Sequence, residues 1–249
     1  MIDKSLIPFL IAGDPCKKFT LNLMERMDEY ADMIELGIPF TDPIADGPTI
    51  QGSTARALEQ GIDIQDVFQI VKTFKNKSNT PIILMSYYNL IYVRGTEHFL
   101  RSAKDAGVDG IIMVDLPLEE SDRYVDLCDK FEVKPIFLAA PNTSYKRLKK
   151  IDELSSFIYL VSTFGTTGSR KKISKFTYDA IKRTKKICNK PIGVGFGISK
   201  PAHVENILKV GADGVIMGSS LIENIEKDRS SAKKKIEEKL KEFKEVMKC

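Results

Sequence analysis

The sequence predicts an α/β protein folded as a single (β/α)8 TIM barrel, with one domain over residues 1–249. Short apolar or β-branched runs alternate with longer amphipathic segments along the whole chain, the pattern of parallel strands joined by helices. Eight such runs fit within 249 residues, a length that suits one barrel. An open doubly wound sheet is less economical, because the sequence offers no dinucleotide fingerprint and no linker-like stretch.

The expected elements follow from these runs in order. The expected strands are 6–12, 33–37, 81–87, 110–115, 135–140, 157–162, 191–195 and 214–218. Helices are expected at 19–29, 64–75, 97–106, 119–131, 145–154, 176–186 and 202–210. After Lys227, the residues Ile236, Leu240, Phe243 and Met247 recur at helical spacing, which predicts a final helix with a charged outer face.

Two internal echoes support the count of eight. The segment "AGVDGIIMVD" at 106–115 recurs as "VGADGVIMGS" at 210–219, a shift of 104 residues (210 − 106). That shift equals four βα units of roughly 25 to 30 residues each, or half a barrel. Pro81, Pro135 and Pro191 open the third, fifth and seventh runs in similar tripeptides, at strand starts where proline is tolerated.

Composition disfavours several classes of function. The net charge is only +4, and no basic stripe is interleaved with aromatic residues, so a nucleic-acid partner is not expected. The longest uncharged stretch, 81–93, is shorter than the roughly 18 apolar residues of a membrane helix. The first apolar run leads into Gly-Asp-Pro rather than a signal cleavage site. Since the four cysteines show no paired spacing, we expect a cytoplasmic protein without a disulfide scaffold, which neither spans nor binds a membrane.

Three glycine-rich segments point to a phosphate site. They are "GTTGS" at 165–169, "GVGFGIS" at 193–199 and "GVIMGSS" at 214–220, the last leading into a helix start at Ser219 and Ser220. Glycine lets backbone N–H groups approach an anion, and a helix N-terminus attracts one. Loops after the seventh and eighth strands often hold phosphate in this fold. The alternative is that the glycines only form tight turns.

Two acids flank the segment "ELGIPFTDPIADGP" at 35–48. Glu35 ends the second predicted strand, so burial at the barrel mouth should raise its pKa and let it donate and accept a proton near neutrality. Asp46 lies on the following proline-rich loop and is expected to stay ionised and bind the substrate. The spacing leaves open another interpretation, in which Glu35 pairs with a core arginine and Asp46 caps a helix at Thr49.

Other chemistries lack their residues. His98 and His203 fall on predicted helices rather than at strand ends, and no metal-binding motif is present, so we expect no metal. No lysine lies within a predicted strand, apart from Lys134 at the entrance of the fifth, so a Schiff-base mechanism is not expected. Carboxylate acid–base chemistry remains.

Several segments, in order along the chain, resemble the tryptophan synthase alpha subunit family. The most specific is "IELGIPFTDPIADGPTIQ" at 34–51. The others are "PFLIAGDP" at 8–15, "LMSYYNLI" at 84–91, "GIIMVDLPLEES" at 110–121, "YLVSTFGTTG" at 159–168, "GVGFGIS" at 193–199 and "GADGVIMGSS" at 211–220. The resemblance implies a TIM-barrel lyase that cleaves indole-3-glycerol phosphate to indole and glyceraldehyde 3-phosphate without a cofactor.

The resemblance also assigns residues. Glu35 matches the family's general acid/base, Asp46 the carboxylate that binds the indole N–H, and Tyr159 the active-site tyrosine. Phe9, Met85 and Tyr87 match the apolar wall and indole cavity, although ordinary barrel packing would also account for Met85 and Tyr87. The remaining substrate-binding matches are Thr167, Gly168, Phe196, Gly197, Gly218 and Ser219.

The resemblance implies a partner as well, a pyridoxal-phosphate-dependent beta subunit in an α2β2 heterotetramer. Pyridoxal phosphate would belong to that partner. Asp42 and Asn89 would lie near the partner face, and the segments 41–47 and 164–172 would close the site. Ile11 and Thr163 depart from the residues usual in the family, threonine and arginine respectively. Only five residues precede the first predicted strand, where relatives carry a helix over the barrel floor.

Two alternatives stay open. Another phosphate-binding barrel, an epimerase or isomerase, would need metal-binding histidines or paired aspartates where this chain has Ala12 and Ala140. A catalytically weak subunit that mainly activates a beta partner is the other alternative, against which the presence of both Glu35 and Asp46 argues.

Overall fold

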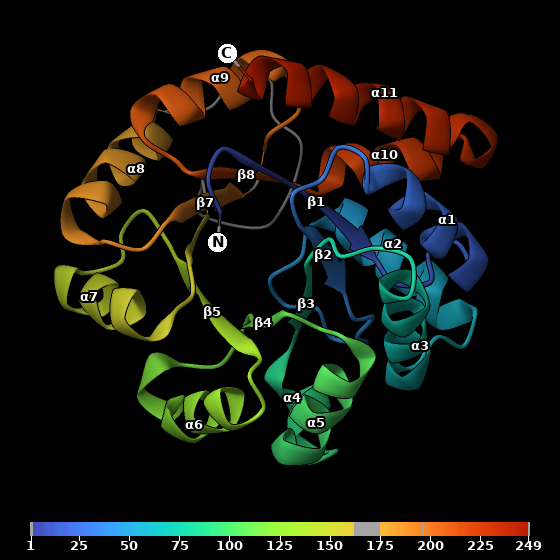
Figure 1. Ribbon diagram of the computed structural model, residues 1–249, viewed down its shortest axis with the longest axis horizontal. Coiled ribbons are helices and arrows are strands. Elements are labelled where there is room, and N and C mark those ends of the chain that lie inside the picture. Colours follow the sequence, from blue (N-terminus) through green and yellow to red (C-terminus); the bar gives the residue numbers. More distant parts are fainter. Residues whose placement is uncertain (1, 162–174, 196, 249) are drawn as a thin grey trace.

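The strands form a closed barrel in the computed structural model, which describes residues 2–161, 175–195 and 197–248 (Figure 1). Each strand pairs in parallel with the next one in the sequence, and β1 pairs with β8 to close the sheet. This confirms the predicted (β/α)8 barrel. The strands are β1 (Ser5–Ile11), β2 (Ile34–Gly37), β3 (Ile82–Ser86), β4 (Gly110–Met113), β5 (Lys134–Ala139), β6 (Ile158–Val161), β7 (Ile192–Gly195) and β8 (Gly214–Met217).

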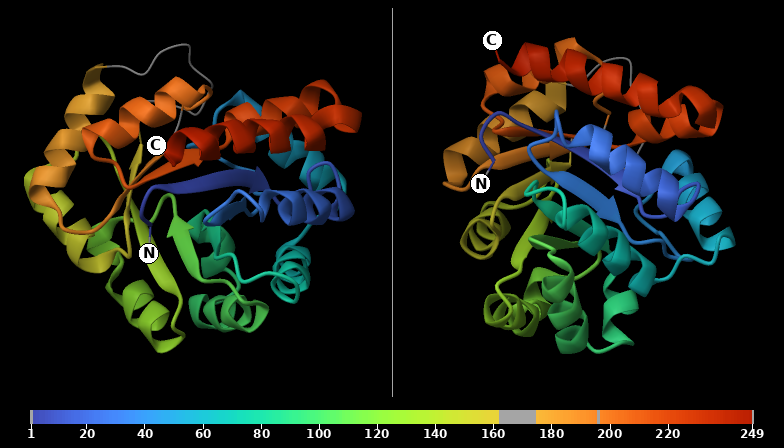
Figure 2. Two further views of the ribbon diagram at one scale, coloured as in Figure 1. Left: turned by 45° about the horizontal axis from the view of Figure 1, so that its top comes forward. Right: turned by 45° about the vertical axis from the view of Figure 1, so that its right-hand side comes forward.

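Helices surround the barrel on the outside (Figure 2). After β8, α10 and α11 pack against each other, and α11 also contacts α1 and α9. The helices of the described part are α1 (Lys17–Met27), α2 (Pro48–Glu59), α3 (Ile64–Lys75), α4 (Tyr88–Tyr92), α5 (Thr96–Ala106), α6 (Asp122–Lys130), α7 (Tyr145–Leu154), α8 (Lys175–Ile187), α9 (Pro201–Val210), α10 (Ser219–Lys227) and α11 (Arg229–Met247), with a short 3-10 helix η1 at Leu118–Glu120.

The predicted strands agree with the structure to within two residues at each end, whereas the helix prediction needs three corrections. The segment predicted as one helix at 119–131 is divided at Ser121 into η1 and α6, and α4 was not predicted. The α2 helix was not among the expected helices, although the alternative interpretation of Asp46 placed a helix at Thr49. Its sequence contains Pro48 and Gly52, which read as loop residues, but proline is favourable in the first turn of a helix. Packing of its buried face against α10 and β1 then stabilises the helix.

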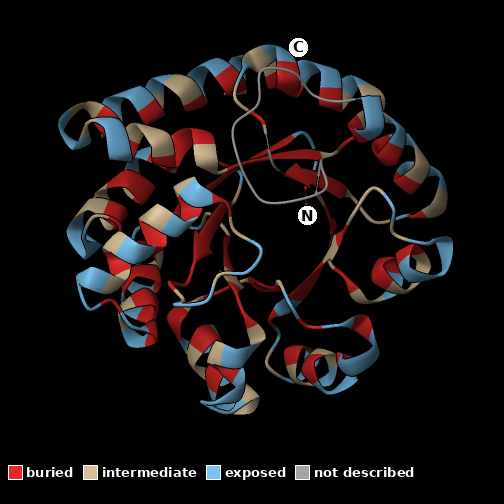
Figure 3. Ribbon diagram, turned by 180° about the vertical axis from the view of Figure 1, so that it is seen from behind, coloured by how far each residue is buried: buried red, intermediate tan, exposed pale blue. Residues whose placement is uncertain are grey.

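Burial follows the expected two-sided pattern, with most strand residues buried and helices buried on their inner faces (Figure 3). The helices cover the outside of the sheet, and a second, smaller cluster fills the barrel interior. In the described part of the chain, no helix is both long and apolar enough to cross a membrane.

The floor of the barrel is covered by the N-terminal residue Ile2. Its side chain is 4% exposed and packs in the interior cluster with Ile7, Phe157 and Ile216. Ile2 Cδ1 lies 3.3 Å from where a Cβ on Gly214 would stand. Figure 1 accordingly shows the N-terminal end near the middle of the ring of strands. An apolar side chain therefore lies at the floor position for which the sequence offered no candidate.

The internal echo has a structural meaning. Asp109 and Asp213 occupy equivalent places in the two echoed segments, directly before β4 and β8. Asp109 Oδ2 accepts from the N–H of Ile82 at 2.8 Å, and Asp213 Oδ2 accepts from the N–H of Ile192 at the same distance. Each carboxylate thus pairs with the first N–H of the preceding strand, so the repeat fixes strand starts on opposite sides of the barrel.

Candidate active site

Glu35 lies inside the barrel. It is the second residue of β2, beside Phe9 on β1 and Ile83 on β3 in the parallel register, and it is 1% exposed. The prediction that Glu35 ends its strand is wrong, because pairing with β1 and β3 continues to Gly37. The carboxyl therefore sits two residues deeper in the barrel than expected.

The environment of Glu35 favours its protonated form. The pKa of Glu35 is raised from 4.5 to about 8. Burial is the largest cause and the nearby charge of Asp46 adds to it, whereas the Tyr159 side chain acts in the opposite direction. Neither carboxyl oxygen has a well-formed hydrogen bond among the described residues. The alternative in which a core arginine pairs with Glu35 is therefore not what the described residues show. At pH 7 a pKa of about 8 leaves roughly ten protonated molecules for each ionised one.

Asp46 lies on the loop between β2 and α2 and is only partly exposed. Its Oδ2 accepts a hydrogen bond of 3.1 Å from the Tyr87 hydroxyl. It does not cap the following helix, because Gly47 occupies the N-cap position. Burial raises the pKa of Asp46 to about 6 while the Tyr87 hydrogen bond lowers it. A pKa of about 6 favours the ionised form of Asp46 at pH 7 by only about one pKa unit.

Tyr159 extends from β6 into the interior and is 3% exposed. Glycine on the neighbouring strand makes this position possible, since a Cβ on Gly195 would stand 2.7 Å from the Tyr159 hydroxyl oxygen. Burial and the adjacent charges of Glu35 and Asp46 hold the pKa of this phenol well above its usual range, so it remains a hydrogen-bond donor. The structure therefore brings the three predicted catalytic residues together.

Phe9 lies on β1 between two glycines. A Cβ on Gly37 would stand 3.0 Å from the ring, and a Cβ on Gly218 would stand 2.8 Å from Cδ1. Gly218 is therefore needed to leave space for an aromatic side chain. Neither of the two interpretations of the glycine-rich segments, phosphate binding or tight turns, included this role. Ile11, one of the departures from the family pattern, packs over Gly37 as well, with Cδ1 2.6 Å from the same Cβ position. The wall next to Glu35 is therefore apolar on this side.

Four other side chains remain partly exposed although they pack against the inner cluster. They are Met33, directly before β2, and Met85, Leu138 and Val161, from β3, β5 and β6. Met85 was predicted from the resemblance, but Leu138 and Val161 were missed. Strand alternation could have found Val161, because it lies two residues beyond Tyr159 and so faces the same side. Tyr87, also predicted here, is 4% exposed and directs its hydroxyl toward the β2–α2 loop.

The predicted phosphate corner is only partly within the described residues. Gly197 has a φ of +75°, a conformation that favours glycine, and Gly218 is the N-cap of α10, where Ser219 is the first residue. The Ser220 hydroxyl donates to the carbonyl of Ile198 at 3.1 Å, which ties the β7 loop to α10. Thr167, Gly168 and Phe196, together with Thr163 and the segment 164–172, lie outside the described residues.

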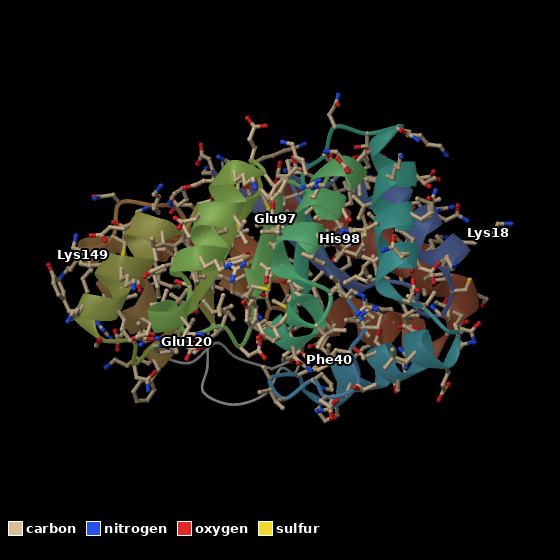
Figure 4. All side chains as sticks on the ribbon, turned by 90° about the horizontal axis from the view of Figure 1, so that it is seen from below. Lys18, Phe40, Glu97, His98, Glu120 and Lys149 are labelled. Carbon is tan, nitrogen blue, oxygen red and sulfur yellow. The ribbon has the colours of Figure 1, made fainter. Side chains whose placement is uncertain are left out.

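Other features lie away from these carboxyls. His98 is exposed on α5, and His203 is buried on α9, both on helices as predicted (Figure 4). Among the described residues, no group of three or more potential metal ligands converges. An open depression of about 310 Å³ lies outside the barrel between α4 and η1, lined by Asn89 and its neighbours, and none of the site carboxyls lines it.

A closed parallel barrel with a buried glutamate and a partly exposed aspartate near each other at one end is an arrangement typical of enzymes of the TIM-barrel class. The sequence profile of the family described as tryptophan synthase alpha chain matches residues 2–248. The chain belongs to this family.

Individual relatives agree along almost the whole length. The tryptophan synthase alpha chain of Pyrococcus furiosus is 52% identical over 243 residues, covering 96% of this chain and 98% of the relative. That of Methanococcus vannielii is 50% identical, covering 96% and 93%. Among solved structures, a chain from the tryptophan synthase α2β2 complex of Pyrococcus furiosus superimposes with a TM-score of 0.93 at 50% identity, covering 97% of this chain and 98% of that chain.

Proposed function

We propose that the protein cleaves indole-3-glycerol phosphate to indole and glyceraldehyde 3-phosphate, with Glu35 and Asp46 carrying the chemistry. Family membership supports the reaction, and the electrostatic influence of Asp46 on the buried Glu35 supports the roles, because it places the two carboxyls near each other. Their proximity is the observation on which the proposal depends, since the reaction needs a proton donor and a stabilising anion at one place.

Glu35 begins the reaction in its protonated form and donates its proton to C3 of the indole ring. The positive charge that develops on the ring nitrogen is stabilised by the ionised Asp46, which accepts a hydrogen bond from the indole N–H. The Glu35 carboxylate then takes the proton from the hydroxyl on the carbon attached to C3. Electrons of that O–H bond form the aldehyde, the bond to C3 breaks, and its electrons restore the aromatic ring.

Glu35 ends the cycle protonated, so the two proton transfers cancel and no cofactor is required. Tyr159 lies near the Glu35 carboxyl as a hydrogen-bond donor, and Phe9, Met85, Leu138 and Val161 form the apolar surroundings of the ring. Gly197, Gly218 and Ser219 place backbone N–H groups for the phosphate, where the N-terminus of α10 favours an anion. Thr167, Gly168 and Phe196 keep their predicted substrate-binding roles as part of this proposal.

The partner in this proposal is a beta subunit in an α2β2 heterotetramer, as in the Pyrococcus furiosus complex. Asp42 and Asn89, the two residues expected near that partner, are both exposed. The single-domain organisation and the cytoplasmic location also remain proposals. The first is supported by a barrel that runs continuously from β1 to β8, and the second by a biosynthetic role inside the cell.

The test is release of free indole from indole-3-glycerol phosphate by the purified chain, alone and with a beta subunit. The parent should release indole, and Glu35→Gln and Asp46→Asn should reduce the rate by about a hundredfold or more, the contribution typical of a proton-transfer or charge-stabilising group. Glu153→Gln, at an exposed position on α7, is the matched control and should match the parent. No indole from the parent, or undiminished release by Glu35→Gln, would refute the proposal.

A further inference from the structure

The loop between β2 and α2, residues 38–47, carries Asp46 and contacts Tyr87, the residue that directly follows β3. The ring of Phe40 lies 5.3 Å from the ring of Tyr87, measured between centroids. The N–H of Ala45 donates to the Tyr87 hydroxyl oxygen at 3.1 Å, and the same hydroxyl lies 3.1 Å from Asp46 Oδ2. Figure 4 shows Phe40 toward the lower side of the view, well below Glu97 and His98. Tyr87 therefore contacts the loop at three places.

Tyr87 is itself held rigidly. It directly follows β3, is the N-cap residue of α4, and is 4% exposed. The strand beneath it is bonded on both sides, since the N–H of Ile38 donates to the Met85 carbonyl and the N–H of Val114 donates to the Ser86 carbonyl, each at 2.9 Å. A side chain in this position can hold a loop that has no strand of its own.

The direction of the two hydrogen bonds is fixed by their chemistry. A backbone N–H can only donate, so the hydroxyl oxygen of Tyr87 accepts from Ala45. The single hydroxyl hydrogen is then directed to Asp46 Oδ2, and the carboxyl must act as the acceptor. This arrangement stabilises ionised Asp46, because a carboxylate only accepts hydrogen bonds. Since Tyr87 holds Oδ2, Oδ1 is the oxygen that can turn toward an indole N–H.

We propose that Tyr87 is a positioning residue for the reaction, which fixes the β2–α2 loop and holds the Asp46 carboxylate ready for the indole N–H. This inference rests on the proposed function and differs from the sequence-based expectation that Tyr87 lines the indole cavity. The Tyr87 hydroxyl orients the Asp46 carboxylate, and the Tyr87 ring holds the loop by packing against Phe40.

Burial disfavours the ionised form of Asp46, and the Tyr87 hydroxyl favours it. Of the described residues, Glu35 faces it from β2 and Tyr159 from β6, and Asp115 after β4 faces Tyr87. The Tyr87 hydroxyl is the group that lowers the pKa of Asp46 against the effect of burial. Its removal should therefore raise the pKa of Asp46.

Tyr87→Phe tests this proposal, since it removes the hydroxyl and keeps the ring on Phe40. Loss of one hydrogen bond to the carboxylate should raise the pKa of Asp46 by about one unit. The acidic limb of kcat/KM should move upward by the same amount, so the loss of activity should be about fivefold greater at pH 6 than at pH 8. Phe40→Leu should instead raise KM and leave the acidic limb in place.

The control is Tyr88→Phe, the same chemical change one residue later. Tyr88 packs against Tyr92 on α4, its backbone N–H bonds to Asp115, and its variant should match the parent in both limbs. Circular dichroism shows whether each variant is folded.

A measurement independent of activity separates this inference from the proposed function. Carbon-13 NMR of labelled aspartate carboxyls gives the pKa of Asp46 in the free protein, with the resonance assigned by its absence in Asp46→Asn. A higher pKa in Tyr87→Phe than in the parent supports the positioning role even where the parent releases no indole. An unchanged pKa and an unchanged acidic limb in folded Tyr87→Phe would overturn it, as would an equal shift in Tyr88→Phe. If Tyr87→Phe does not fold, an acidic limb that moves in Phe40→Leu overturns it, and a raised KM with that limb unchanged supports it.

Discussion

Replacing Glu35 with glutamine should abolish most of the activity and make the protein more resistant to unfolding at alkaline pH. The carboxyl of Glu35 is buried at 1% exposure, and its pKa rises from 4.5 to about 8 in the folded protein. Glutamine has no proton to lose, so Glu35→Gln removes this titration. The buried amide adds a cost of its own, but that cost is the same at every pH.

The magnitude follows from linkage between protonation and folding. Between the unfolded and folded pKa values the folded state binds more protons, so Glu35 stabilises the fold below pH 4.5 and this contribution is lost as the pH rises through about 8. Since one pKa unit is about 1.4 kcal/mol, the parent should lose about 3 to 4 kcal/mol between pH 5 and pH 8 through this group. With an unfolding entropy of about 2.1 cal/mol/K per residue, this corresponds to a difference of about 7 °C in Tm for a chain of 249 residues.

Differential scanning calorimetry at pH 5 and pH 8 measures the effect. The Tm of Glu35→Gln minus that of the parent should be several degrees larger at pH 8 than at pH 5. Glu153→Gln controls for the loss of one acid at the surface. Equal Tm differences at both pH values would mean that Glu35 is ionised in the folded protein, which would refute its assignment as the proton donor.

Three further substitutions test the surroundings of the site. Gly218→Ala places a Cβ 2.8 Å from Phe9 Cδ1, so the ring must move. The KM for the substrate should then rise by about tenfold or more. A KM within twofold of the parent value would show that Phe9 moves freely. Asp14, which is 2% exposed, forms an ion pair of 2.7 Å with Arg56 that joins the loop after β1 to α2. Asp14→Asn breaks this pair and should lower the free energy of unfolding, measured in urea, by about 3 kcal/mol. A loss below about 1 kcal/mol would show that the pair does not stabilise the fold. Ile2→Ala opens the barrel floor and should lower Tm by several degrees, for a cost of about 2 to 4 kcal/mol, without changing KM; an unchanged Tm would mean that the floor is closed without Ile2.

The strands were predictable because proline and glycine mark their ends. Pro81 and Pro191 lie directly before β3 and β7, and Pro135 is the second residue of β5, so all three mark strand starts as expected. The α2 helix was not predictable by the same reasoning, because Pro48 and Gly52 imitate a loop. Its stability comes from contacts with α10 and β1, which local sequence does not reveal.

For the site, the sequence indicated which acids matter but not how they are arranged. The depth of Glu35 depends on pairing with two other strands, and the raised pKa of Asp46 depends on burial that a surface loop did not suggest. The glycine-rich segments indicated places where a side chain would not fit, but they did not indicate which group occupies the space. Gly195 and Gly218 make room for Tyr159 and Phe9, contacts between residues far apart in the chain.

The central claim is that a protonated Glu35 works beside an ionised Asp46, and the pH dependence of kcat/KM for indole release tests it most directly. We predict a bell-shaped profile with an acidic limb near pH 6 from Asp46, an alkaline limb near pH 8 from Glu35 and an optimum near pH 7. The residual activity of Glu35→Gln should lose the alkaline limb and keep the acidic one. A parent profile that rises without a decline through pH 9, or an alkaline limb that persists in Glu35→Gln, would contradict it.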